Sequence, residues 1–168
     1  MVASGILAED EPLELIDGAL IVVSPQGPVH ANLIYAIRRA LEAVVPHSVC
    51  VRSHSPVDAG EASLPEPDLA VIRGDWRQYF ARHPRGDELL LAVEVAHTSQ
   101  AIDRRKARIY AAAGVPVYWL VDVPARCIEV RSDPLPDGTY ALTKLVGEAE
   151  SLEVPGAEAR LPASELLP

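Results

Sequence analysis

The sequence predicts an α/β or α+β fold, in which helices pack on a central sheet. Three observations predict it: an early pattern typical of a β-hairpin, two stretches with helical spacing of apolar residues, and several short apolar runs between turn-forming residues. In chain order these give a hairpin, a helix, strands, a second helix and further strands. Elements in this order bury their apolar faces when the helices pack on a sheet.

The first half of the chain begins with the hairpin. Apolar runs at Leu13–Ile16 and Ala19–Val23 flank Asp17-Gly18, a dipeptide that suits a two-residue turn. Pro28–Val45 has apolar residues on one helical stripe, and its proline lies in the first turn, where proline is tolerated. We expect a strand, a long loop and a second strand to follow at 49–52, 53–67 and 68–72.

The second half contains the most apolar segment of the chain. Leu89–Val95 is nearly all apolar, which is typical of a strand buried on both faces. Ser99–Ala113 predicts a helix that is capped by Ser99 and ends at Gly114. The remaining expected elements are a short helix or loop at 74–86 and strands at 117–121, 127–131 and 140–146, with a turn around 136–138 before the last strand.

Length and composition limit the class of protein. The 168 residues predict a single domain over 1–168, with a core at about 12–146. Apolar residues make up 49% and charged residues 23%, which is typical of a packed domain and excludes a disordered or coiled-coil chain. No apolar run approaches the roughly 20 residues that span a bilayer, so no membrane association is expected. Met1–Asp10 lacks a secretory-signal pattern and the chain has two cysteines, so we expect a cytoplasmic location.

The net charge of −9 is concentrated at the two ends of the chain. Residues 9–17 hold five acids and no base, and the acidic C-terminal segment 147–168 holds five glutamates and one arginine. Residues 18–146 balance at 14 acids and 14 bases. An acidic protein repels phosphate, so charge alone disfavours a nucleic-acid partner, although the balanced middle weakens that objection.

Three charged residues are placed unusually for their surroundings. Asp68 opens a predicted strand directly after Pro67, where it is either a cleft carboxylate or a solvated turn residue. Glu94 follows an apolar run, where a carboxylate is costly to desolvate unless it is paired or binds a metal. Alternatively, Glu94 marks the solvated end of the strand. The five apolar residues that directly precede the glutamate favour the functional interpretation.

Lys106 is the third of these residues. At about 100° per residue, it lies at the centre of the apolar stripe of its predicted helix. The stripe consists of Ile102, Ile109, Tyr110 and Ala113. A lysine in this position either extends along the apolar surface to solvent or meets a buried carboxylate. The simpler alternative is a surface pair with Asp103, three residues earlier.

Two carboxylates and an inward lysine suit the hydrolysis of a phosphodiester bond. Asp68, Glu94 and the backbone carbonyl of Val95 would hold Mg²⁺ or Mn²⁺ through oxygen ligands. The metal would polarise the phosphate and lower the pKa of its bound water. Lys106 would orient that water or stabilise the developing charge.

Several motifs together resemble the Uma-two family, a group of endonucleases in the restriction-endonuclease-like, PD-(D/E)XK superfamily. The resemblance runs from about Glu14 to Val130. It rests on Pro67–Val71, Val93–Ala96, Asp103–Lys106, Tyr110–Pro116 and Tyr118–Asp122, and on Glu14–Gly18 followed by His30. It implies a central mixed sheet flanked by helices, Mg²⁺-dependent cleavage of DNA, and a homodimer.

The resemblance also assigns site residues. Asp68 and Glu94 match the acids of the family motif. The usual lysine two residues after the second acid is replaced by Ala96, and Lys106 matches a lysine that the following helix supplies.

Two N-terminal residues and two departures complete the comparison. Glu14 and His30 match polar positions that would complete the site, although His30 within its apolar stripe also suits a hydrogen-bonded core histidine. His97 stands where members of the family often have Ser or Asp. Val117 stands where a Glu is common.

Two other functions stay open. The acidic ends and the absence of a dedicated DNA-reading motif favour a binding or assembly protein that keeps the nuclease fold without activity. A transition-metal hydrolase would use His30, His54 or His97 with the carboxylates, but their spacings fit no standard zinc motif. The segment Arg73–Arg85 mixes arginines with aromatic residues, which suits either nucleic-acid binding or a solvated turn.

Overall fold

A mixed sheet of six strands forms the centre of the computed structural model, which describes residues 11–97 and 99–168. The segment 1–10, in which we expect no secretory signal, lies outside the described residues. The strands stand in the order β3-β4-β5-β6-β7-β8; β5 and β6 run parallel, and the other neighbours run antiparallel. Their bounds are β3 Val49–Ser53, β4 Leu69–Arg73, β5 Leu89–Ala96, β6 Val117–Asp122, β7 Cys127–Pro134 and β8 Tyr140–Gly147.

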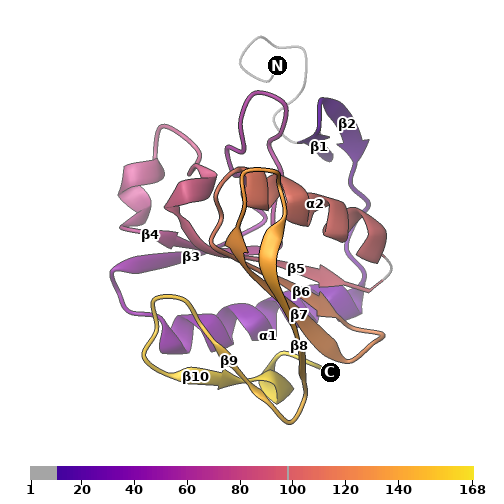
Figure 1. Ribbon diagram of the computed structural model, residues 1–168, viewed down its shortest axis with the longest axis vertical. Coiled ribbons are helices and arrows are strands. Elements are labelled where there is room, and N and C mark those ends of the chain that lie inside the picture. Colours follow the sequence, from indigo (N-terminus) through magenta and orange to yellow (C-terminus); the bar gives the residue numbers. More distant parts are fainter. Residues whose placement is uncertain (1–10, 98) are drawn as a thin grey trace.

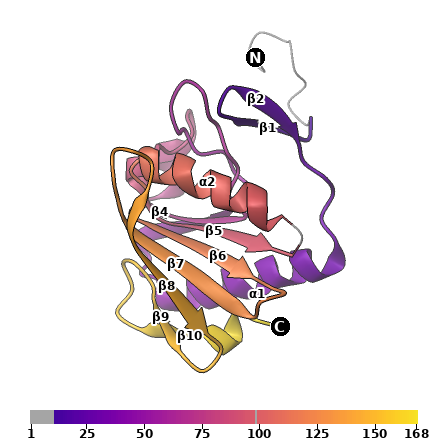
Figure 2. The same ribbon diagram turned by 45° about the vertical axis from the view of Figure 1, so that its right-hand side comes forward.

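Two helices cover opposite faces of this sheet (Figure 1). The first, α1 (Pro28–Val44), precedes the sheet in the chain, and the second, α2 (Gln100–Ala112), connects β5 to β6. Parallel neighbours need such a crossover connection. The C-terminal part of the chain packs on the same side of the sheet as α1 (Figure 2).

The N-terminal hairpin lies on the α2 side of the sheet (Figures 1 and 2). Its strands β1 (Leu13–Ile16) and β2 (Ala19–Val22) meet at a turn in which Asp17 and Gly18 have φ of 50° and 78°. Positive φ at both positions is what a two-residue hairpin turn requires. Asp17 also pairs with Arg105 of α2 at 3.0 Å, which fixes the turn to the body of the protein.

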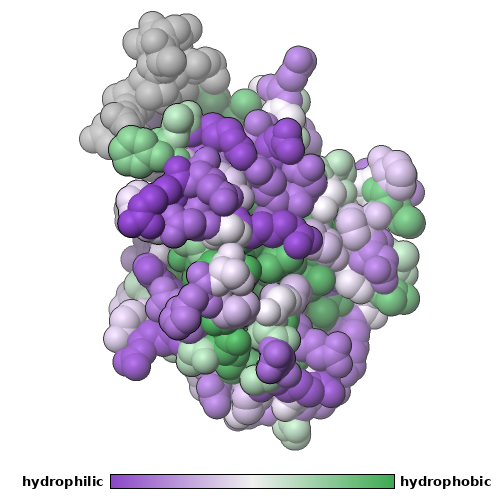
Figure 3. Space-filling view, turned by 90° about the vertical axis from the view of Figure 1, so that its left-hand side faces the viewer, coloured by the Kyte–Doolittle hydropathy of each residue, from purple (hydrophilic) through white to green (hydrophobic). Residues whose placement is uncertain are grey.

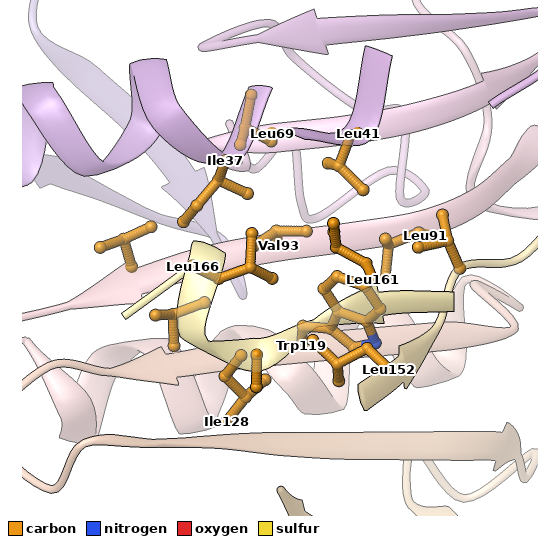
Figure 4. Packing of buried hydrophobic residues seen from close by; sticks show 14 of the residues in the cluster. Ile37, Leu41, Leu69, Leu91, Val93, Trp119, Ile128, Leu152, Leu161 and Leu166 are labelled. Atoms are coloured by element: carbon orange, nitrogen blue, oxygen red, sulfur yellow. The ribbon is translucent and has the colours of Figure 1, made fainter. Parts of the chain in front are cut away.

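The main core lies between α1, the sheet and the C-terminal segment (Figure 4). The strand β5 is buried along all eight residues, as its apolar run predicts. Trp119 of β6 is fully buried in this core, and a second cluster around Tyr110 and Tyr118 fills the space between the sheet and α2.

The acidic segment 147–168 folds back under α1, although we expected no element there. It forms β9 (Ser151–Glu153), β10 (Arg160–Pro162) and the 3-10 turn η3 (Ala163–Glu165). Leu152, Leu161 and Leu166 of this segment are buried. The segment therefore carries part of the core between its exposed acids.

The predicted fold class is confirmed: a central mixed sheet flanked by helices, with an N-terminal hairpin. The hairpin, both helices and the strands occur where the sequence predicts them, within a few residues. The helix cap is an exception, because the Ser99 side chain makes no capping bond and instead donates to Asp103 at 2.5 Å. None of the described helices has both the length and the apolar character that a membrane span needs.

The C-terminal segment should contribute measurably to stability. Leu161→Ala removes a side chain that is 2% exposed, so we expect the free energy of unfolding to fall by about 2–5 kcal/mol in urea titrations. Leu145→Ala, at a position 62% exposed, is the matched control and should change it by less than about 0.5 kcal/mol. Equal effects of the two substitutions would contradict the packing described here.

Candidate active site

Asp68 and Glu94 lie side by side on neighbouring strands. Leu69 pairs with Val93 at the end of the β4–β5 ladder, so the next position along each strand is occupied by Asp68 and by Glu94. Side chains directly opposite each other on antiparallel strands lie on one face of the sheet. Asp68 is only 9% exposed and Glu94 only 3%. Neither carboxylate is therefore a solvated residue at the end of a strand.

Asp68 is held by three groups. Its Oδ2 accepts a hydrogen bond from the backbone N–H of Val95 at 2.8 Å and lies 3.1 Å from His30 Nε2. His54 Nδ1 lies 3.8 Å from the other oxygen, Oδ1. The carboxylate is thus oriented from β5, from the first turns of α1 and from the loop after β3.

Lys106 joins two carboxylates that are distant in the sequence. Its Nζ lies 2.8 Å from Glu14 of the hairpin and 3.1 Å from Glu94 of β5. It also donates to the backbone carbonyl of Glu66 at 3.3 Å. Tyr110, one turn further along α2, donates its hydroxyl proton to Glu94 at 2.9 Å.

The inward direction of Lys106 follows from the apolar stripe of α2. Lys106 is 6% exposed and meets a buried carboxylate, which is one of the two outcomes that the stripe predicts. The alternative surface pair with Asp103 does not form, because Ser99 donates to the Asp103 carboxylate and Lys106 points to Glu14 and Glu94.

Burial and charge set the protonation of this cluster. Burial raises the pKa of Glu94 well above its ordinary range; the Lys106 ammonium opposes this shift, and the nearby Asp68 carboxylate adds to it. Burial alone would lower the pKa of Lys106, but the carboxylates of Glu94 and Glu14 outweigh it, so that the pKa is raised. Lys106 is therefore a fixed ammonium group.

His30 reaches the site from α1, and its side chain is 21% exposed. Its hydrogen bond to Asp68 raises the pKa of the imidazole, burial opposes this effect, and the backbone of Val95 adds a further increase. His30 is thus hydrogen-bonded, as the core-histidine alternative also expects, and its partner is the predicted site carboxylate of Asp68.

A single cavity of about 550 Å³ brings the predicted residues together. The six that line it are Glu14, His30, Asp68, Glu94, Val95 and Lys106. The cavity lies between the hairpin, the start of α1, the ends of β4 and β5, and α2. His54 and His97 line it as well.

The donor set suits a small divalent cation. Asp68 and Glu94 offer hard carboxylate oxygens to the same cavity. The Asp68 carboxylate also raises the pKa of Glu94, and a bound cation would relieve this repulsion between like charges. Mg²⁺ is commonly bound by one or two carboxylates together with waters and substrate phosphates. Over residues 11–97 and 99–168, no group of three or more His, Cys, Asp or Glu side chains is arranged to hold a metal.

Some site residues were not predicted as such from the sequence. The apolar stripe accounts for Tyr110 as a core residue only. Tyr110 follows Lys106 by four residues, however, and this helical spacing places both side chains on the same face, which is the signal that could have identified it as a site residue. The carbonyl of Glu66 and the imidazole of His54 come from the long loop, where no local pattern marks them. Their contacts depend on how the loop folds over the sheet.

The segment Arg73–Arg85 lies at the other end of β4 from Asp68 and contains the 3-10 turn η1 (Trp76–Tyr79). A second 3-10 turn, η2 (Gly86–Glu88), follows it. The face that carries the segment is mostly hydrophilic, with small hydrophobic groups among polar residues (Figure 3). Three of its arginines pair with acids: Arg77 with Asp75, Arg82 with Glu88 and Arg85 with Asp87. These pairs favour the solvated-turn interpretation of the segment.

The amino-acid sequence matches the model of a known protein family. A family model named Uma2 and described as "Putative restriction endonuclease" matches residues 5–163, nearly the whole chain. The chain belongs to the Uma2 family. The resemblance found in the sequence is thereby confirmed.

A solved structure shares the fold. It is described as "a putative nuclease belonging to DUF820" from Anabaena variabilis ATCC 29413, and it is similar to this chain with a TM-score of 0.74. The two are 21% identical, over 95% of this chain and 92% of that one. No curated protein matches the chain.

The buried pair of Lys106 and Glu94 can be tested by unfolding. Lys106→Met leaves the carboxylates of Glu94 and Glu14 without their cation, so the free energy of unfolding should fall by about 3–5 kcal/mol. Adding Glu94→Gln to this variant should recover part of the loss, because one uncompensated charge is removed. A loss below about 1 kcal/mol for the single variant, or no recovery in the double variant, would show that the pair does not form.

The pair of Arg82 and Glu88 predicts a pH effect. The double hydrogen bond from Arg82 lowers the pKa of Glu88 from 4.5 to about 2. A lowered pKa stabilises the fold above pH 4.5, and this contribution is lost as the pH falls towards 2. Glu88→Gln should therefore lose less stability than the wild type between pH 5 and pH 2 in urea titrations. Parallel curves for the two proteins would contradict the assignment.

Proposed function

We propose that the protein is a nuclease that hydrolyses phosphodiester bonds of DNA with the help of Mg²⁺ or Mn²⁺. The observation that carries the proposal is one cavity that joins two strand carboxylates, Asp68 and Glu94, to the buried ammonium of Lys106. Membership of the Uma2 family and the fold shared with a protein described as a nuclease support it.

The carboxylates and the lysine have separate roles in this proposal. Asp68, Glu94 and the carbonyl of Val95 would hold the cation. When bound, the cation supplies polarisation of the phosphate and lowers the pKa of its bound water. Lys106 stabilises negative charge that develops on the phosphate, because a fixed ammonium is a preorganised electrostatic partner. With its pKa raised, Lys106 does not act as the base that takes a proton from water.

Glu14 and His30 act through the other residues. Glu14 receives Lys106 on both of its oxygens, at 3.0 and 2.8 Å, and so keeps the ammonium in place when Glu94 turns to a cation. His30 and the backbone N–H of Val95 hold the Oδ2 atom of Asp68, whereas Oδ1 lies 3.8 Å from His54 Nδ1. Both are positioning residues in this account.

The alternatives differ in what supports them. The acidic ends of the chain still favour a binding or assembly protein without activity, whereas the contact of Lys106 with Glu94 favours a catalytic site. A transition-metal hydrolase would use His30, His54 or His97 with the carboxylates, and the spacings of these histidines in the sequence fit no standard zinc motif. The homodimer implied by the family remains a prediction.

Cleavage of DNA tests the proposal directly. The purified wild type should cleave plasmid and single-stranded DNA in Mg²⁺ or Mn²⁺ and should be inactive in EDTA. Asp68→Asn and Glu94→Gln should each lower the rate at least about a hundredfold, because each removes a charged ligand.

The control for these variants is Asp75→Asn, at an exposed carboxylate beyond the other end of β4. It should cleave at the wild-type rate. Full cleavage by the double variant Asp68→Ala, Glu94→Ala would rule the proposal out.

A further inference from the structure

The cavity has an acidic floor and an apolar wall. The floor consists of the carboxylates described above, and the wall comes from the hairpin, the segment after it and α2. Three of the wall residues are unusually exposed for their type: Val22 is 72% exposed, Val29 47% and Val23 39%. The half-buried Ile21 and Ile102 complete the wall. Exposed apolar side chains gathered at one site mark a surface for binding.

The wall is attached to the body of the protein at several points. Leu64 N–H donates to the carbonyl of Leu15 at 2.8 Å, and Gly18 N–H donates to the carbonyl of Ala62 at 2.7 Å. The ion pair of Asp17 with Arg105 adds a side-chain contact at the turn. The hairpin thus presents a preformed wall to the ligand.

The charge of the cavity limits how many phosphates it can accept. Five carboxylates line it, those of Glu14, Glu66, Asp68, Glu94 and Asp103. In the part of the chain that the structure describes, Lys106 is the only lysine or arginine among the lining residues. Proteins that bind duplex DNA neutralise several phosphates with lysine and arginine. This cavity has cations enough for a single phosphate beside its metal.

We propose that the cavity binds an unpaired nucleotide of a single DNA strand, with its phosphate at the acidic floor and its base against the apolar wall. The inference rests on the proposed nuclease function and names its substrate class. In a duplex the bases are stacked inside and the phosphates lie outside, so a wall beside the reacting phosphate meets no apolar surface. An unpaired base offers that surface, and proteins that bind single strands commonly do so through contacts with the faces of the bases.

Binding without hydrolysis tests this inference. Fluorescence anisotropy in Ca²⁺ would compare a labelled thymidine strand of about 12 nucleotides, its duplex, and a strand of the same length with abasic sites. We expect the single strand to bind at least about tenfold more tightly than both other probes. The abasic strand keeps every phosphate, so it separates contacts of the bases from contacts of the backbone.

Variants of the wall locate the contact. Val22→Ser with Val23→Ser leaves the net charge unchanged and should weaken binding of the single strand at least about fivefold, through lost apolar contact. The matched control is Leu142→Ser with Leu145→Ser, two exposed residues of β8 outside the cavity, and it should bind as the wild type does.

The outcomes separate the two proposals. Preferred binding of the single strand without any cleavage in Mg²⁺ or Mn²⁺ would support the inference and remove the nuclease function. Cleavage of duplex and single strand at equal rates would keep the nuclease and overturn the inference. Equal binding of the abasic strand, no binding of any probe, or an unchanged affinity of the wall variant would also overturn it.

Discussion

The buried contact of Lys106 with Glu94 and Glu14 connects the parts of the structure on which the site depends. It joins α2 to the central strand β5 and to the N-terminal hairpin, and Lys106 and Glu14 are separated by 92 positions in the sequence. Carboxylates that are 3% and 7% exposed need a compensating cation, because an unpaired buried charge is costly. The ammonium group of Lys106 compensates these buried carboxylates. In the proposed nuclease, the same ammonium group also stabilises charge on the phosphate.

Much of the fold could be predicted because its signals are local. Asp17-Gly18 between two apolar runs marks the hairpin, and the apolar run Leu89–Val95 marks the buried strand. The C-terminal segment was missed because its strands β9 and β10 have three residues each, too few to show a period. Its leucines are buried only because α1 and the sheet offer a surface, which no local pattern reveals.

The site was predictable to the extent that its residues conflict with their surroundings. Glu94 in an apolar strand and Lys106 on an apolar stripe are both anomalies that the sequence displays, and they meet at 3.1 Å. The hydrogen bond of Val95 N–H to Asp68 and the approach of His54 depend on the register of the sheet and the path of a long loop. Such contacts follow from the tertiary structure, so sequence patterns could not supply them.

We propose that Asp68 and Glu94 share one divalent cation, and a crystal soaked in Mn²⁺ tests this proposal most directly. We expect an anomalous-scattering peak between the two carboxylates, with Lys106 still in contact with Glu14. A crystal that shows no peak there at saturating Mn²⁺, or a peak held by the histidines alone, would contradict it.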